Sequence, residues 1–515
     1  MRKSAKLISL MLAFILAFCA CSHSTDSVSK DGSSEDHKNG GTIKMGCVPI
    51  DTLNPLITNH SSIADFLSLV YEGLFAAMPD LSVKPILASE YVASKDNTVY
   101  TIKLKGGVKF HNGKNFSSED VIATLSYIGM YGGKYSSVSD SISSFTAPSE
   151  DTVIITLKKP IADFVNSLDF PILPSGLGYG DFASPSLAFI PVGTGMYVYD
   201  STVEYKNIYL KANTSWHNEQ KRPHIDKVDI EILSDEETVI SAFDAGAIDI
   251  LATSWKNPAE LNLTSDLYNS FSTEQNRLTF IGINDAVAAF DTKEERNAFV
   301  SVINRDKLCE DIMLGRAKAT TFPIREGIYF NEETAETDKA EKENASVNED
   351  LKTIEKPSQI VLLYNSDSKT KKRLALNLKQ QLDIAGYNTV LSGQPFDAYL
   401  SKVANSEYDL YIGEASIDNS SNLEFMFGEE RSSQNICSYS APELATLVSN
   451  LNRMSGKENK LVALENFKKY YLDNAFQVSL YFTNGEAYVT KRVSGELSPN
   501  LSNLYYGFEN LYFEK

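Results

Sequence analysis

Residues 99–121 read VYTIKLKGGVKFHNGKNFSSEDV, and this stretch decides how the fold of the chain is interpreted. Apolar and polar side chains alternate from Tyr100 to Leu104, which predicts a strand with one buried face. Asn112-Gly113 is typical of a two-residue hairpin turn. Ser117 and Asp120 have the spacing of a capping box, which predicts that a helix begins there. The stretch therefore predicts a strand, a hairpin and a helix in immediate succession.

The length and charge of the chain limit the classes of protein to which it can belong. With 515 residues, 43% of them hydrophobic, the chain exceeds the size that one hydrophobic core usually accommodates, so we expect two or three domains. The 67 acidic residues outnumber the 48 basic ones, which gives a formal net charge of −19. This acidity argues against nucleic acid as a partner.

The N-terminal residues predict export and membrane anchoring. Residues 1–20 combine a basic start with an apolar run that is too short to span a bilayer, as in a signal peptide. Cys21 follows Ala20 at the end of this run, and the pair resembles the lipobox of bacterial lipoproteins, so we expect Cys21 to carry the lipid. The alternative is ordinary cleavage near Ala20, which would leave a free thiol. Residues 21–41 are polar and rich in Ser and Gly, which predicts a flexible tether.

The other cysteines and the histidines form no recognisable site in the sequence. Beyond the leader, the cysteines are Cys47, Cys309 and Cys437. Their odd number and wide spacing predict neither a disulfide framework nor a thiolate metal site. Pro223 argues against a helix around His217 and His224, so we interpret both as surface histidines in a turn rather than as a metal pair. The sequence contains no nucleophile elbow, zinc-protease motif or phosphate-binding loop, and we expect a protein that is no enzyme and binds no cofactor.

Three further motifs have the order and spacing of one known family. They are VYEGL at residues 70–74, PILASEY at 85–91 and PVGTGMY at 191–197. Together with residues 99–121, they resemble the motifs of the family 5 solute-binding proteins of ABC importers, which bind oligopeptides, dipeptides or nickel. Ser89 and Asn112 depart from the family pattern, and both changes are conservative for a surface hairpin.

The resemblance implies an α/β, periplasmic-binding-protein-like fold of type II, with two lobes, a hinge and an extra inserted domain. The sequence supports this class, because a strand at residues 359–364, a helix capped by Ser368 and a strand at 388–391 form a β-α-β unit. The predicted domains are domain I at residues 42–78, 185–274 and 485–515, domain II at 79–184, and domain III at 275–484. We expect the strand at residues 42–48 to pair with a strand from residues 191–250.

Several other elements are predicted from periodicity. Apolar residues at three- and four-residue spacing predict helices at residues 61–75 and 294–313. Apolar runs predict strands at residues 278–284 and 475–482. A charged stretch at residues 334–352 is interpreted as a solvated loop rather than as a recognition motif.

The resemblance implies a substrate-binding lipoprotein of an ABC importer, anchored through its lipid to the outer face of the bacterial cytoplasmic membrane. Such a protein captures short peptides in the cleft between its lobes and delivers them to permease subunits in the membrane. We expect it to act as a monomer. Two alternatives stay open, namely a binder of a nickel chelate or another small solute, and a peptide-pheromone receptor on the same fold.

The resemblance also indicates candidate ligand-binding residues. In peptide-binding members of the family, an acidic residue holds the amino terminus of the peptide, and the corresponding segment here begins at Gly413. Glu414 or Asp418 could take this role, and the alternative is a solvated loop acid. Two other groups correspond to family contact regions: Asn59, His60 and Ser61, and the pair Tyr481 and Phe482. Their alternative interpretations are a satisfied turn for the first group and core packing for the second.

Overall fold

The computed structural model of the chain describes residues 40–177, 189–253, 257–261, 263, 267–284, 286–325, 358–420, 422–427, 441–454 and 456–514. The predictions for the signal peptide, Cys21, Cys437 and residues 334–352 lie outside these residues. The described residues contain one large sheet, one four-stranded sheet and two small two-stranded sheets.

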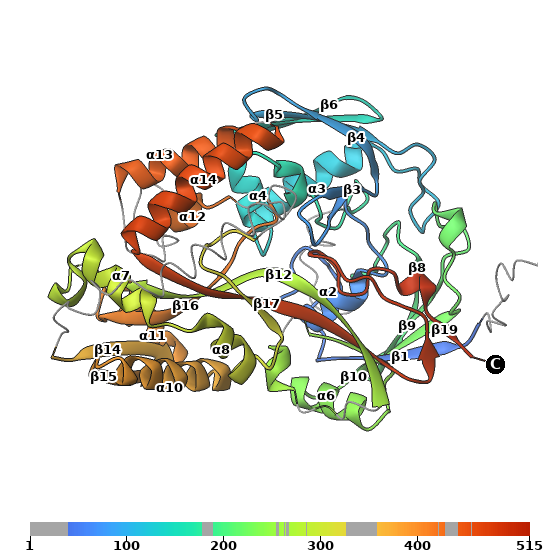
Figure 1. Ribbon diagram of the computed structural model, residues 1–515. Helices are drawn as coiled ribbons and strands as arrows, with labels where there is room; N and C mark the ends of the chain where they lie inside the picture. The colour runs from blue at the N-terminus through green and yellow to red at the C-terminus, as the bar shows by residue number, and fades with distance from the viewer. Residues whose placement is uncertain are drawn as a thin grey trace, which may run out of the picture.

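The large sheet runs through most of the molecule (Figure 1). Its strand order is β15-β14-β16-β12-β17-β11-β1-β10-β9-β8, and β13 pairs with β17 beside this path. The bounds are β1 Thr42–Cys47, β8 Tyr197–Val203, β9 Asn207–Ala212, β10 Lys227–Ile232, β11 Ile250–Ala252, β12 Tyr268–Ile283, β13 Ala317–Ala319, β14 Ile360–Asn365, β15 Thr389–Gln394, β16 Leu410–Ser416 and β17 Gln477–Thr490. β1 lies parallel to β10, so the expected pairing of the first strand is present.

Two long antiparallel strands join the two halves of this sheet. β12 has 16 residues and β17 has 14, and β12 pairs with β17 from Tyr268 to Gly282. β12 also pairs with β16 in one half, and β17 pairs with β11 in the other. Figure 1 shows both strands crossing the molecule. We call the part on β1 and β8–β11 the first lobe, comprising residues 40–253 and the returning segment 491–514, and the part on β13–β16, residues 286–476, the second lobe.

The β12–β17 pairing is irregular at the crossing between the lobes. Glu274 pairs with Asn484, and the register shifts before Arg277 pairs with Thr483. The predicted boundaries between domains I and III fall at the same place, after residues 274 and 484. The division into three domains stays a prediction, and this boundary lies within continuous strands rather than in linkers.

The four-stranded sheet contains the stretch that decided the interpretation of the sequence. Its order is β4-β5-β7-β6. The bounds are β4 Ala88–Ala93, β5 Val99–Leu104, β6 Ile142–Ser149 and β7 Thr152–Leu157, with helices α3 Ser118–Tyr131 and α4 Ser136–Ser141 beside them. The Phe110 amide donates to the Lys114 carbonyl across the hairpin (2.8 Å), and the Ser117 amide donates to Asp120 Oδ2 at the start of α3 (2.8 Å). The predicted strand, hairpin and helix are confirmed.

The helix predicted at residues 61–75 is wrong in length. α2 spans only Ser61–Leu67. Beyond it, the chain pairs with the PVGTGMY motif, because the Tyr197 amide donates to the Leu69 carbonyl and the Gly195 amide to the Val70 carbonyl, both at 2.9 Å. These backbone groups are then not available to a longer helix, so tertiary pairing overrides the apolar periodicity.

The predicted β-α-β unit of the second lobe is confirmed. α10 Lys369–Ile384 connects the parallel strands β14 and β15, and the Ser368 hydroxyl accepts a hydrogen bond from the Lys371 amide at its start (3.2 Å). The other helices of this lobe are α7 Lys293–Ser301, α8 Arg305–Asp311, α11 Phe396–Ala404, α12 Glu424–Phe427, α13 Pro442–Arg453 and α14 Lys457–Asn474. Residues of α7, α8 and α10 share one hydrophobic core, and residues of α11 to α14 share another.

Three other predicted elements have different bounds. The helix predicted at residues 294–313 is two helices, α7 and α8, because Asn304 Oδ1 accepts a hydrogen bond from the Lys307 amide and starts α8 anew (2.9 Å). The strands predicted at 278–284 and 475–482 are the apolar parts of β12 and β17. Both strands continue through polar residues that an apolar pattern does not mark.

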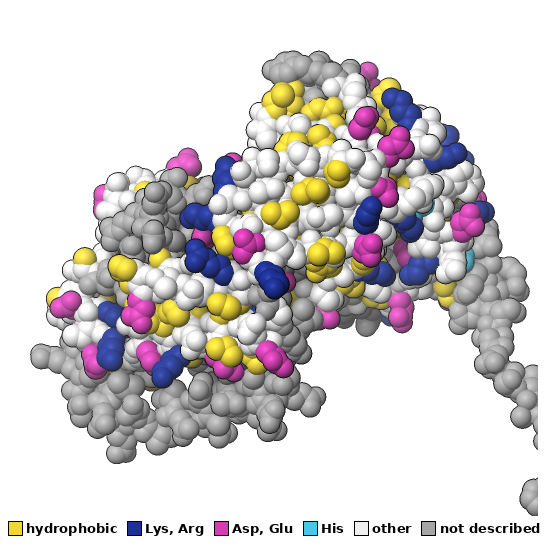
Figure 2. All heavy atoms as spheres, turned by 90° about the horizontal axis from the view of Figure 1, so that it is seen from above, with side chains coloured by type: hydrophobic (Ala, Val, Ile, Leu, Met, Phe, Trp, Pro, Cys, Tyr) yellow, Lys and Arg dark blue, Asp and Glu magenta, His cyan; other side chains and the backbone are white. Residues whose placement is uncertain are grey.

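The remaining elements complete the first lobe. They are β2 Phe75–Ala77 paired with β3 Val83–Pro85, α6 Glu236–Asp244, and β18 Val493–Ser494 paired with β19 Tyr512–Phe513. Cys47 and Cys309 are buried free thiols, and burial raises the pKa of each to about 12. On the face seen in Figure 2, acidic and basic side chains are interspersed, so the net negative charge is not gathered into one patch there.

Candidate functional site

Asp418 lies in a turn directly after β16. Its Oδ1 accepts hydrogen bonds from the amides of Ser420 (2.9 Å) and Asn422 (3.2 Å), whereas Oδ2 accepts none from the described residues. Burial raises the pKa of Asp418, the hydrogen bonds from Ser420 and Asn422 oppose this shift, and the charge of Asp169 adds to it. The turn therefore holds a half-buried carboxylate that keeps one oxygen free of its own hydrogen bonds.

Asn419, the next residue, connects this turn to the first lobe. Its side-chain amide donates to Asp169 Oδ2 (2.9 Å), and its backbone carbonyl accepts a hydrogen bond from Asn166 Nδ2 (3.1 Å). Its Oδ1 accepts a third hydrogen bond from Asn276 Nδ2 on β12 (3.1 Å). The turn that carries Asp418 is thus in contact with both lobes and with one of the crossing strands.

Glu414 has a different environment. It lies on β16, with its side chain 41% exposed, and its carboxylate is 2.8 Å from Lys371 Nζ and 3.8 Å from Arg277 Nε. Burial would raise the pKa of Glu414, but the charges of Lys371 and Arg277 outweigh it and lower the pKa. Glu414 therefore already has cationic partners, whereas Asp418 has none among its hydrogen-bond partners.

Gly413 lies on β16 beneath an aromatic ring. A Cβ atom at this position would lie 2.3 Å from the ring of Phe280, so the side chain of any other residue would collide with it. Only the backbone of Gly413 is able to contact a ligand.

Tyr481 and Phe482 are neighbours on β17 that belong to different cores. Tyr481 is 1% exposed and packs in the core of α7, α8 and α10, and Phe482 is 3% exposed and packs in the core of α11 to α14. Neither lines the pocket described below. Their assignment to the ligand stays a prediction, and their burial agrees with the alternative of core packing.

Asn59, His60 and Ser61 form the loop that leads into α2. The Asn59 amide donates to Asp51 Oδ2 (2.7 Å), and the Asp51 carboxylate also accepts a hydrogen bond from the Thr58 hydroxyl (2.8 Å). Asn59 and His60 are exposed, and Ser61 is the first residue of α2. A ligand role for these three residues stays a prediction.

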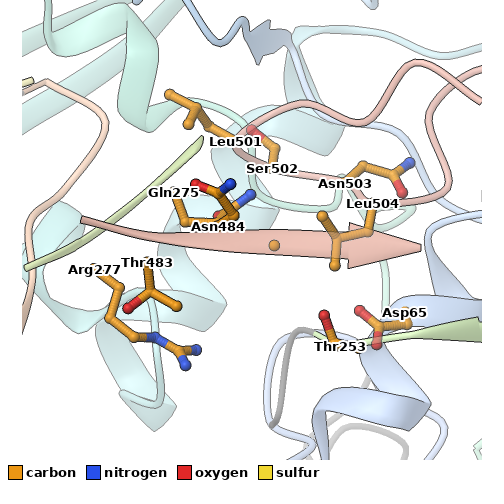
Figure 3. Close-up of a pocket in the computed structure, with 11 residues that line it drawn as sticks. Asp65, Thr253, Gln275, Arg277, Thr483, Asn484, Leu501, Ser502, Asn503 and Leu504 are labelled. Atoms are coloured by element: carbon orange, nitrogen blue, oxygen red, sulfur yellow. The ribbon is translucent and has the colours of Figure 1, made fainter. Parts of the chain in front are cut away.

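A pocket of about 90 Å³ lies where β12 and β17 cross between the lobes (Figure 3). Its walls come from α2, the end of β11, the irregular part of the β12–β17 pair and a C-terminal loop. The lining residues are Asp65, Thr253, Gln275, Arg277, Thr483, Asn484, Gly485, Leu501, Ser502, Asn503 and Leu504.

The pocket is lined by one acidic and one basic side chain and by a buried hydrogen-bond acceptor without a partner among the described residues. Asp65 and Arg277 lie toward opposite ends of the view in Figure 3. The Gln275 side chain is engaged, because its Nε2 donates to the Asn500 carbonyl (3.3 Å). Asn484 Oδ1 is buried and has no hydrogen-bond partner among the described residues. Buried acceptors are normally paired in native proteins, so this atom can pair with a donor on a bound molecule.

The sequence interpretation missed all the residues of this pocket. A signal was present, because polar runs at residues 275–277 and 483–485 directly border the apolar parts of the two strands. Both runs lie at the predicted boundaries between domains I and III. Members of both runs line the pocket, so polar residues within a strand that crosses between lobes are candidates for ligand contact.

His217 is not the surface histidine that we predicted. Its side chain is only 9% exposed, and its Nε2 lies 2.8 Å from Glu72 Oε2. His224 packs edge-on against Tyr512, with ring centroids 6.2 Å apart. Across the part of the chain that the structure describes, no three or more His, Cys, Asp or Glu side chains are grouped so that they could hold a metal ion.

Comparison with known proteins places the chain in a family. A family model described as bacterial extracellular solute-binding proteins, family 5 Middle, matches residues 82–434. The chain belongs to this family, as its motifs predict. In the described residues, no helix has the length and apolar character needed to cross a membrane.

Two curated relatives are peptide-related by name. The chain is 25% identical over 336 residues to the oligopeptide-binding protein AppA of Bacillus subtilis (strain 168), a match that covers 61% of this chain and 59% of AppA. It is 28% identical over 289 residues to the glutathione-binding protein GsiB of Escherichia coli (strain K12), covering 54% of this chain and 55% of GsiB. The matched regions therefore span between half and two thirds of these relatives.

Solved structures of the same fold cover nearly the whole chain. The ABC transporter substrate-binding protein CtaP of Listeria monocytogenes superimposes with a TM-score of 0.74 at 20% identity, covering 93% of this chain and 100% of CtaP. The predicted α/β fold of the type II periplasmic-binding-protein class is thus confirmed.

Proposed function

We propose that this protein is the substrate-binding component of an ABC importer, and that it captures short peptides between its lobes as a monomer and delivers them to permease subunits. The observation that carries the proposal is the half-buried carboxylate of Asp418, which has no cationic hydrogen-bond partner and lies where the two lobes meet. The names of AppA and GsiB support a peptide ligand.

Asp418, rather than Glu414, is our candidate for the residue that holds the amino terminus of the peptide. A free ammonium group would supply the charge that Asp418 lacks, whereas Lys371 and Arg277 already serve Glu414. A charge pair in a cleft from which water is largely excluded is stronger than one at the surface. The pocket between the lobes supplies an acceptor, Asn484 Oδ1, which matches an amide donor of a peptide.

The first experiment identifies the ligand and then removes its charge. Native mass spectrometry of the purified protein should detect co-purifying short peptides, and one of these is then synthesised with a free and with an acetylated amino terminus. For the free peptide, calorimetry should show that Asp418→Ala loses roughly 2–5 kcal/mol of binding free energy, which corresponds to a loss of about thirty-fold or more in affinity. Acetylation should weaken binding to the wild type by a similar factor.

Two matched variants serve as controls. Asp235 also accepts hydrogen bonds from neighbouring residues, Ser234 and Thr238, but it is exposed at the start of α6, so Asp235→Asn should leave the affinity unchanged. Glu414→Ala should have a smaller effect than Asp418→Ala. Unchanged affinity in Asp418→Ala and for the acetylated peptide would refute the ammonium anchor. A nickel chelate or another small solute in the native mass spectrum, in place of peptides, would refute the peptide ligand itself.

The proposal includes a lipid anchor at Cys21 on the outer face of the cytoplasmic membrane. The basic and apolar leader, Ala20 and the polar tether support it. We expect Cys21→Ala to be found in the soluble fraction after cell fractionation, whereas the wild type sediments with membranes. A mutant that stays fully membrane-bound would contradict the anchor without bearing on the peptide site.

A further inference from the structure

We infer that Asn419 is a positioning residue, which makes the placement of the Asp418 carboxylate depend on contact between the two lobes. The importance of this coupling for ligand capture rests on the proposed function. The coupling itself is a property of the protein alone and can be tested without a ligand.

Asn419 uses three polar groups to bind two segments outside its own turn. Its Nδ2 donates to Asp169 of the first lobe, its carbonyl accepts from Asn166 of the first lobe, and its Oδ1 accepts from Asn276 at the irregularity of β12. The Ile417 amide donates to the Asn276 carbonyl as well (2.9 Å). The residues on either side of Asp418 are therefore held by hydrogen bonds to segments outside the turn.

The first-lobe side of this contact is fixed by its own backbone. The Phe75 amide donates to the Leu168 carbonyl (3.2 Å), and the Ile172 amide donates to the Glu72 carbonyl (3.0 Å), so Asp169 lies between two backbone hydrogen bonds. A Cβ atom at Gly73 would lie 2.6 Å from the Asp169 carbonyl oxygen, which shows how closely the two backbones approach. Asp169 thus presents its carboxylate from a rigid position.

A second set of contacts between the lobes leads to the same turn. The Asn97 side-chain amide, in the turn between β4 and β5, donates to the Arg453 carbonyl at the end of α13 (3.2 Å). The neighbouring Asn452 Nδ2 donates to Asn422 Oδ1 (2.9 Å). The Asn422 amide is one of the donors to Asp418 Oδ1. The first lobe therefore contacts segments on both sides of Asp418, through Asn419 on one side and through the turn of Asn97 on the other.

Separation of the lobes would remove the bonds of Asn419 to Asp169 and Asn166. The Asp418 turn would then keep its internal hydrogen bonds, from the amides of Ser420 and Asn422, and its bonds to Asn276 and Asn452. It would lose both of its anchors on the first lobe. Such short turns open more readily when their outside contacts are lost, so these amides would exchange faster with solvent. The carboxylate would be fixed for a ligand only when the lobes are in contact.

The test is hydrogen exchange, followed by mass spectrometry, on the full-length, ligand-free protein. Asp169→Ala changes only the first lobe, yet it should speed exchange of the second-lobe segment 417–422 about tenfold. Asn419→Asp places two carboxylates against each other and should have a similar effect. The double variant Asn419→Asp with Asp169→Asn exchanges donor and acceptor, because the amide introduced at position 169 can donate to the carboxylate introduced at position 419. It should restore wild-type exchange.

Asn112→Asp is the matched control. Asn112 lies in the exposed hairpin turn, where its Oδ1 accepts a local hydrogen bond from the Lys114 amide, so the same chemical change there should leave segment 417–422 unaffected. A single variant that also speeds exchange in α10, which lies away from the contact, has lost stability throughout the protein. The double variant then decides whether the coupling at Asn419 exists. Restored protection of 417–422 in the double variant supports the coupling. Wild-type exchange in Asp169→Ala, or fast exchange that persists in the double variant, overturns it, whatever the ligand proves to be.

Discussion

The carboxylate of Asp418 has opposite consequences for stability and for binding. Burial and the charge of Asp169 raise its pKa, and an acid whose pKa is raised by folding stabilises the folded state at low pH. This contribution is complete below the ordinary pKa of 3.8 and is lost as the pH rises through the folded-state pKa. At neutral pH the ionised side chain therefore lowers the free energy of unfolding.

We accordingly expect Asp418→Asn to unfold at a higher temperature than the wild type at pH 7, although it binds peptide more weakly. The asparagine can still accept the hydrogen bonds of the turn. The difference in melting temperature should shrink as the pH falls toward 3.8. Thermal unfolding followed by circular dichroism over this pH range measures it.

The control for this prediction is Asp96, whose pKa is shifted in the opposite direction from that of Asp418. Hydrogen bonds from Ser94 and Thr98 lower the pKa of Asp96, so its ionised form stabilises the folded state above its ordinary pKa. Asp96→Asn should not raise the melting temperature at pH 7. Equal stabilisation by both variants would indicate a general effect of reduced negative charge.

A second prediction at the residue scale concerns the close backbone approach at Gly193. A Cβ atom there would lie 2.0 Å from the Val70 carbonyl oxygen. Gly193→Ala should therefore lower the free energy of unfolding by about 1–3 kcal/mol. Gly106→Ala has no atom within 4 Å of the new Cβ and should change it by less than about 0.5 kcal/mol. Urea denaturation measures the free energy of unfolding of both variants. An equally small change in both would show that the backbone adjusts to the new Cβ atom at position 193 without loss of stability.

At the level of elements, the N-terminus of α10 is capped by a side chain from a distant segment. Glu260, which follows β11 in the chain, accepts a hydrogen bond at Oε1 from the Thr370 amide in the first turn of α10 (2.9 Å). A carboxylate at this end also interacts favourably with the helix dipole. Glu260→Ala should cost about 1 kcal/mol of stability, and Glu260→Gln, which keeps an acceptor but not the charge, should cost less. Urea denaturation in low salt measures both, and a larger loss in the glutamine variant would contradict this assignment.

The elements that were predicted correctly are those whose local signals and tertiary contacts agree. The strand, hairpin and helix of residues 99–121 and the β-α-β unit around α10 carry their turns and caps in the sequence. α2 is shorter than its apolar pattern, because the backbone of Leu69 and Val70 pairs with a motif more than a hundred residues away. β12 and β17 are longer than their apolar runs, because two strands that cross between lobes need not be apolar throughout.

The candidate site was predictable only where a family motif marked it. Asp418 and Glu414 were identified by resemblance, and their hydrogen bonds and ion pairs were needed to distinguish them. Asp65, Arg277 and Asn484 come from α2, β12 and β17, which no local pattern brings together. The contacts of Asn419 likewise depend on the packing of the two lobes.

For the whole molecule, the continuous strands β12 and β17 have a consequence for heat denaturation. Proteins whose domains are joined by flexible linkers commonly melt in separate steps. Here each lobe has a sheet edge that is completed by strands shared with the other, so neither lobe can melt without exposing unpaired backbone in its neighbour. We expect one heat-absorption peak in scanning calorimetry, with equal calorimetric and van't Hoff enthalpies. Two resolved peaks would contradict this expectation. A protein built to open and close would then melt as one cooperative unit, because the two strands that join its moving parts also complete their sheets.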